Sequence, residues 1–189
     1  FLIKEAGHEV TDEQREVEVN GVKGHIDAII DGVVVDVKSA SPYGYKKFEQ
    51  DTVTQDDPFG YVYQLSGYAH ELTPKKPAAW VAFDKVAGDI CVSELKPIVI
   101  EHHEPAPRIE ELKEVLENDE PPKPCYEPVP DGKSGNMKLP VGCSYCAHKF
   151  RCYKDQGTPL RGFAYSTGPR YLTKVAKEPN VPEITIDGF

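Results

Sequence analysis

Apolar and polar residues alternate in the first forty positions in a way that predicts β-strands. Three segments are rich in valine and isoleucine: 16–19, 22–30 and 33–38. They are separated by Asn20-Gly21 and Asp31-Gly32, dipeptides that suit two-residue hairpin turns because they accept positive φ angles. The pattern therefore predicts two hairpins in succession, preceded by a helical turn over residues 1–6 that stops at Gly7.

Helical spacing replaces this alternation further along the chain. Residues 59–72 carry apolar side chains at helical intervals, and residues 107–118 repeat that pattern with Ile109, Leu112, Val115 and Leu116 on one face. Segments 78–83 and 90–95 again predict strands, with a turn around Gly88, whereas the polar segment 39–58 predicts a mobile loop. Together these elements predict an α/β (α+β) fold of the restriction-endonuclease-like kind, a mixed central sheet flanked by helices.

The character of the chain changes at Pro121, where prolines, glycines and four of the five cysteines replace the periodic pattern. We therefore expect a core domain over residues 1–120 and a metal-clipped cysteine lobe over residues 121–155. Residues 156–189 are expected to form an extended C-terminal tail that packs on the core.

The composition excludes some classes of function but does not identify one. Charged residues make up 28% of the chain and hydrophobic residues 39%, an ordinary globular balance. The net charge of −9 disfavours broad phosphate binding, although lysines cluster locally, as at Lys46 and Lys47. No apolar run approaches the roughly 18 residues of a membrane span, so we expect no membrane role. The first residue is Phe1, so nothing about targeting is drawn from that end.

The Asp31-Gly32 turn predicts a register for the second hairpin. Counting back from it places Asp27 opposite Asp36 and His25 opposite Lys38, on the face away from Ile26, Ala28, Ile30, Val33, Val35 and Val37. Two opposed carboxylates destabilise a sheet, so we expect a divalent cation to take oxygen ligands from both. The alternative is an exposed hairpin whose polar face meets water.

These residues resemble the PD-(D/E)XK nuclease superfamily, especially its RecB-like and phage exonucleases. The resembling stretches are Gly24-His25-Ile26-Asp27, Asp36-Val37-Lys38 and Gln64-Leu65-Ser66-Gly67-Tyr68. The resemblance implies that Asp27, Asp36 and the Val37 carbonyl bind Mg²⁺ or Mn²⁺ (one or two ions), and that Lys38 activates or orients the attacking water.

The same resemblance assigns roles to further residues. Gln64 and Tyr68 match the family's Gln-x-x-x-Tyr motif and would position Lys38 and contact DNA from one helix face. His25 is either an additional metal ligand or a hydrogen-bonding group. Relatives supply another acidic ligand from the preceding helix, for which Glu5, Glu9 or a residue before Phe1 are the candidates.

The cysteines form a second constellation. Cys143-x2-Cys146-x5-Cys152, with Cys125 upstream, has the spacing of a tetrahedral thiolate site. It also resembles the cysteine lobe of the iron–sulfur nucleases of CRISPR adaptation and of bacterial helicase–nuclease repair complexes. Structural Zn²⁺ is expected, with a four-iron–four-sulfur cluster as the alternative. Cys91, in an apolar segment, is expected in the core.

The leading hypothesis is a metal-dependent DNA exonuclease, a hydrolase that acts on ends or single strands of linear DNA in recombination, repair or DNA degradation. Its expected setting is the cytoplasm of a bacterial or phage-infected cell, with a recombination partner protein or a second copy of the chain as possible partners. The alternatives are a non-catalytic nucleic-acid-binding module with a zinc knuckle, and a CRISPR-adaptation nuclease that trims spacer precursors.

Overall fold

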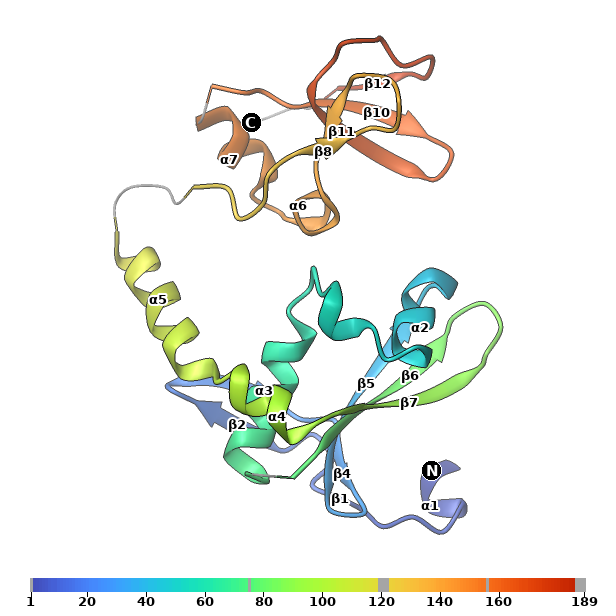
Figure 1. Ribbon diagram of the computed structural model, residues 1–189, viewed down its shortest axis with the longest axis vertical. Helices are drawn as coiled ribbons and strands as arrows, with labels where there is room; N and C mark the ends of the chain where they lie inside the picture. Colours follow the sequence, from blue (N-terminus) through green and yellow to red (C-terminus); the bar gives the residue numbers. More distant parts are fainter. Residues whose placement is uncertain (1, 75, 119–122, 156, 186–189) are drawn as a thin grey trace. The chain divides into compact units, whose positions relative to one another are not determined.

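A five-stranded mixed sheet organises the first of two units in this computed structural model, which describes residues 2–74, 76–118, 123–155 and 157–185 (Figure 1). The units are Phe1–Glu117 and Asn118–Phe189. The expected boundary near residue 120 falls on residues outside the described ones. The three expected domains therefore stay predictions.

The sheet of the first unit has the strand order β1-β4-β5-β6-β7. Its members are β1 (Val10–Thr11), β4 (Ala28–Ile30), β5 (Val33–Ala40), β6 (Ala78–Asp84) and β7 (Ile90–Leu95). β5 and β6 run parallel, and the other neighbours run antiparallel. A parallel pair needs a long crossover, and the chain between β5 and β6 supplies it.

A separate hairpin, β2 (Glu16–Val19) with β3 (Val22–His25), precedes β4, and α1 (Leu2–Glu5) precedes β1. Asn20 and Gly21 have φ angles of 48° and 80°, and Asp31 and Gly32 have 50° and 77°. Both predicted hairpin turns are confirmed, because paired positive φ values are those that two-residue turns need.

The crossover contains α2 (Pro42–Glu49), the short 3₁₀ helix η1 (Val53–Gln55) and α3 (Tyr61–Leu72). The prediction of a mobile loop over residues 39–58 is wrong, because β5 continues to Ala40 and α2 follows, with Tyr45 and Phe48 buried. Ser41 starts α2 by accepting a hydrogen bond from the Gly44 amide, and its next residue is proline.

Helices α2 and α3 both pack on the sheet, and the main core lies beneath them. α3 in turn contacts α4 (Pro97–His102), which the sequence did not predict, and α5 (Pro105–Glu117). The predicted apolar face of α5 is only partly used: Ile109 packs against the main core, whereas Leu116 is 84% exposed.

The main core is centred on Trp80, Leu65 and Phe48, and the opposite sheet face carries a smaller cluster that includes Val35 and Val81. The expectation that Ile26 shares a face with Val35 is wrong, because Ile26 lies in the main core, the cluster that also contains Val34.

The second unit has an antiparallel sheet of order β12-β10-β11-β9-β8. Its elements are β8 (Val129–Pro130), β9 (Met137–Lys138), α6 (Val141–Tyr145), α7 (Lys149–Asp155), β10 (Arg161–Tyr165), β11 (Gly168–Lys174) and β12 (Glu183–Ile184). The expected extended tail is therefore wrong in its local structure, since β10 and β11 form a hairpin and β11 pairs with β9.

The expected fold class is confirmed: the first unit is a mixed α/β structure with a central mixed sheet and flanking helices. None of the helices in the described parts of the chain combines the length and apolar character needed to cross a membrane.

Candidate active site

The candidate site lies where the second predicted hairpin departs from its expected geometry. The pairs Ala28–Val35, Ile29–Val34 and Ile30–Val33 are confirmed. The chain then leaves the ladder at Ile26-Asp27, so the expected pairs Asp27–Asp36, Ile26–Val37 and His25–Lys38 do not form. A break in the strand frees Asp27 to turn its side chain toward the neighbouring strand.

Asp27 is fixed from two sides. Its Oδ2 accepts a hydrogen bond of 2.6 Å from the Val37 amide, and its Oδ1 accepts one of 3.1 Å from Gln14 Nε2. The Gln14 amide also donates to the Asp27 carbonyl at 3.2 Å. The carboxylate is therefore held against β5 next to Asp36, although not through the predicted strand pairing.

Asp36 is a buried acid, only 5% exposed, in the middle of β5. Burial raises the pKa of its carboxyl above the usual range; Lys38 opposes the rise and the charge of Asp27 adds to it. Lys38 Nζ lies 2.7 Å from Asp36 Oδ2, so the ammonium and the buried carboxylate form an ion pair.

Lys38 is held on three sides. Besides Asp36, its ammonium donates to Gln64 Oε1 at 3.0 Å and lies 4.5 Å from the centre of the Tyr61 ring. Gln64 and Tyr61 are three residues apart on α3, so they reach the same side of the helix. Asp57 supports the start of this helix, because its Oδ2 accepts a hydrogen bond from the Val62 amide at 2.8 Å.

Tyr68 lies on the same side of α3, against Gly24. A Cβ atom at Gly24 would come 2.6 Å from the Tyr68 hydroxyl, so a larger residue here would force the Tyr68 ring to shift. His25 is exposed and stands opposite Glu16 in the β2–β3 hairpin. Of the sequence-predicted residues, the structure thus brings Asp27, Asp36, Lys38 and Gln64 together. Tyr68, on α3, lies against Gly24 of β3, and His25 is the last residue of that strand.

The donor set fits a hard divalent cation in part. Asp27 and Asp36 offer carboxylate oxygens, which hard divalent cations prefer as ligands. Over the residues that the structure describes, no three His, Cys, Asp or Glu side chains are grouped so that they could hold a metal. Mg²⁺ suits such a site, because it commonly takes one or two carboxylates and completes its shell with water and phosphate.

The two upstream acids considered as further ligands, Glu9 and Glu5, precede β2. The Glu9 amide and carbonyl bond to Asp31, at the turn end of β4 and β5. Glu5 is exposed in α1. The backbone of Glu9 is thus tied to the turn at Asp31, and an upstream acidic ligand stays a prediction.

The cysteines of the second unit lie near one another. Cys143 is buried and Cys152 half-buried, whereas Cys125 and Cys146 are exposed. Burial raises the pKa of the Cys143 thiol, and its three cysteine neighbours raise it further. Their thiols are close enough to interact, but the described side chains do not form a ready metal-binding group. Cys91 packs against the main core of the first unit, as predicted.

Comparisons with known proteins add one distant likeness. No family model matches the chain, and no curated protein matches it either. A crystal structure of an alkaline exonuclease from Laribacter hongkongensis matches with a TM-score of 0.38 and 15% sequence identity. The match covers 61% of this chain and 66% of that chain.

Two residues of the site were not predicted. Gln14 gives no local signal, because it belongs to a turn whose contact with Asp27 arises only in the folded chain. Tyr61 could have been found, since it precedes Gln64 by three positions on a predicted helix and shares its face.

Proposed function

We propose that the chain is a metal-dependent deoxyribonuclease that hydrolyses phosphodiester bonds of linear DNA. One observation carries the proposal: a lysine ammonium is held by Asp36, Gln64 and the Tyr61 ring, next to a second carboxylate, Asp27. A buried acid with a raised pKa beside a specific charged partner is the kind of arrangement that functional sites use.

The residues have separable parts in this chemistry. Mg²⁺ or Mn²⁺, held by Asp27 and Asp36 and by the Val37 carbonyl, would polarise the scissile phosphate and lower the pKa of a bound water. Lys38 would orient that water and stabilise the negative charge that develops on the phosphate. Gln64 and Tyr61 would keep the ammonium in place, so little reorganisation is needed during the reaction.

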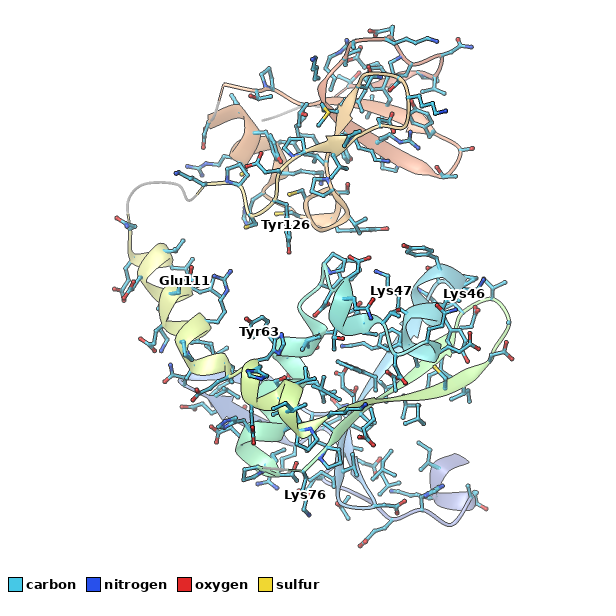
Figure 2. The ribbon with its side chains drawn as sticks, viewed as in Figure 1. Lys46, Lys47, Tyr63, Lys76, Glu111 and Tyr126 are labelled. Carbon is cyan, nitrogen blue, oxygen red and sulfur yellow. The ribbon has the colours of Figure 1, made fainter. Side chains whose placement is uncertain are left out.

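The proposal is tested with end-labelled single- and double-stranded DNA incubated with Mg²⁺ or Mn²⁺. Lys38→Ala is expected to lower the hydrolysis rate by about 10²- to 10³-fold, the range for removing one transition-state donor. Lys46→Ala is the matched control, because Lys46 is an exposed lysine on α2 (Figure 2). Product lengths report polarity and end preference in the same gels.

Two results would contradict the proposal. One is hydrolysis by Lys38→Ala and Asp36→Ala proteins at the wild-type rate. The other is wild-type protein that binds DNA without hydrolysing it under any divalent-ion condition, which would favour the non-catalytic binding module. A recombination partner, a homo-oligomer and a cytoplasmic setting stay predictions of the sequence.

We also propose that Cys125, Cys143, Cys146 and Cys152 hold a structural metal in the second unit. Their spacing supports it, together with the closeness of the other three thiols to Cys143, whose pKa they raise in addition to the effect of burial. Metal analysis of the purified chain is expected to find about one Zn²⁺ per protein. A brown preparation with broad visible absorbance would instead identify an iron–sulfur cluster, and a metal-free, fully folded chain would contradict the proposal.

A further inference from the structure

The Lys38 ammonium is the counter-ion of the buried Asp36 carboxylate. Lys38 Nζ lies 2.7 Å from Asp36 Oδ2, and the two side chains are only 17% and 7% exposed. Burial raises the pKa of the Asp36 carboxyl, and the ammonium opposes that rise. An unpaired charge in such a place is strongly destabilising, so the ion pair with Lys38 helps to keep Asp36 ionised inside the fold.

This ion pair and a divalent cation compete for one carboxylate. The proposed metal ligands are Asp27 and Asp36, and Asp36 already has a positive group against it. Two carboxylates and one ammonium leave a single negative charge, which a divalent cation overcompensates. An ammonium and a metal ion on the same carboxylate repel each other, and the repulsion is strong where little water screens it.

Helix α3 gives the ammonium a second set of contacts. Gln64 Oε1 accepts a hydrogen bond from Lys38 Nζ at 3.0 Å, and the same nitrogen lies 4.5 Å from the centre of the Tyr61 ring. A carbonyl oxygen and an aromatic face both stabilise an ammonium. Lys38 can therefore give up its ion pair with Asp36 and remain bound to α3.

We propose that the divalent cation displaces Lys38 from Asp36, and that Gln64 and Tyr61 then hold the ammonium as positioning residues. This inference rests on the metal site of the proposed nuclease function. Lys38 lowers the apparent metal affinity, because only the state in which it has left Asp36 is competent to bind. Gln64 and Tyr61 raise that affinity, since they stabilise the competent state.

The test measures metal affinity in the absence of DNA. The full chain is titrated with Mn²⁺ in mildly alkaline buffer, and free Mn²⁺ is followed by electron paramagnetic resonance. Thiolates select softer metals, so Mn²⁺ reports on the carboxylates. Lys38→Met keeps the apolar stem and removes the charge. We expect it to bind Mn²⁺ about tenfold more tightly, the factor that applies when one molecule in ten is competent.

Lys47→Met is the matched control. Lys47, on α2, is 20% exposed, pairs with Asp56 and lies over the Tyr43 ring, so it has the same kinds of partners as Lys38 (Figure 2). Its replacement removes one positive charge from the chain but leaves the ion pair of Asp36 intact. We expect the Mn²⁺ affinity of this variant to stay within about twofold of the wild type.

Variants on α3 should act in the opposite direction. Gln64→Met removes the acceptor and is expected to weaken Mn²⁺ binding by about three- to tenfold, the order of coupling between contacting residues. The loss should disappear in the Lys38→Met/Gln64→Met protein, where no ammonium is left to hold. Tyr61→Leu is expected to weaken binding too, whereas Tyr61→Phe keeps the ring and the wild-type affinity.

Four results would overturn the inference. They are a Lys38→Met affinity equal to or below that of the wild type, an equal gain in Lys47→Met, a Gln64→Met loss that persists in the double variant, and no Mn²⁺ binding by either wild type or Lys38→Met. Failure of the nuclease proposal is distinct. A chain that binds Mn²⁺ in the expected pattern but hydrolyses no DNA keeps this inference and loses the other.

Discussion

The two units bury very different cores. The first unit packs Trp80, Phe48 and Leu65 between a five-stranded sheet and two helices. The main cluster of the second unit is Leu139, Cys143, Tyr153 and Leu160, with Cys152 packed against it. A large core can tolerate a buried charge and a strained turn, whereas a small core commonly needs a covalent or metal staple.

The two units also differ in which residues lower or maintain their stability. The buried carboxyl of Asp36 and the turn that contains Gln14 both lie in the first unit. In the second unit, two of the candidate thiolate ligands are themselves part of the core. Removing ligands should therefore unfold the second unit, whereas changes at the site of the first should alter activity with little effect on folding.

The largest expected effect is on the second unit. Cys146→Ser removes one proposed ligand at an exposed position, and we expect a loss on the order of several kcal/mol, because structural metal binding contributes directly to folding. Hydrogen exchange of peptides from residues 123–185 is expected to become fast, while peptides from the first unit stay protected. Chelation of the wild-type chain should reproduce this pattern.

The control is Cys91→Ala, which is expected to leave the metal content unchanged because Cys91 lies in the first unit. If Cys146 does not bind a metal, replacing this exposed residue by serine should change the free energy of unfolding by no more than about 0.5 kcal/mol. Unchanged exchange in Cys146→Ser would therefore show that the small core is sufficient by itself, and the contrast between the units would fail.

The next effect is catalytic and concerns Gln14. This residue has a φ of 56°, which glycine adopts without strain, so Gln14→Gly removes the contact with Asp27 and relieves the backbone together. We expect about a tenfold fall in activity and a higher Mg²⁺ concentration for half-maximal rate. The reason is that Gln14 no longer holds Asp27, a proposed metal ligand, in position. The melting temperature should stay the same or rise.

Gln55→Ala serves as the comparison, since Gln55 is an exposed glutamine in η1. A parallel loss of stability and activity in Gln14→Gly would assign the turn a structural role. An unchanged Mg²⁺ dependence would remove Gln14 from the site.

The smallest expected change in stability is a gain, at Asp36. Asp36→Asn should abolish activity and raise the melting temperature by a few degrees, about 1 kcal/mol or less, because the buried charge is gone. The folded-state pKa of Asp36 lies above its unfolded value. Its ionisation therefore costs stability as pH rises through that interval, and the cost persists at neutral pH.

The stability difference between Asp36→Asn and wild type should consequently shrink as pH falls below both pKa values. Thermal melts over an acidic-to-neutral pH series measure it, with exposed Asp56→Asn as the reference. A variant that is less stable than wild type at neutral pH would mean that the ion pair with Lys38 outweighs burial.

Local chemistry made much of the first unit predictable. The Asn20-Gly21 and Asp31-Gly32 turns, α3 and the strands β6 and β7 follow from dipeptide preference and periodicity. Helix α2 escaped prediction because its buried residues, Tyr45 and Phe48, stand among polar neighbours, and their burial depends on the sheet.

The candidate site was predictable in membership but not in geometry. A two-residue turn sets the register only while the ladder continues, and this ladder ends at Ile26-Asp27. There the Gln14 amide donates to the Asp27 carbonyl and the Ile26 amide donates to the Arg15 carbonyl. Those bonds join residues that are distant in the sequence, so no local sequence pattern predicts them. The carboxylates were correctly expected together, for a reason that was partly wrong.

The parallel pairing of β5 with β6 has a consequence for how the protein folds. Asp36 pairs with Trp80, so the strand that carries the buried acid and Lys38 gains its central neighbour only after the chain has closed a crossover through α2 and α3. Closing such a loop before its contacts form is slow compared with making a local hairpin. The β2–β3 hairpin can therefore form early, whereas the proposed active centre is expected to assemble in the last, rate-limiting step of the first unit.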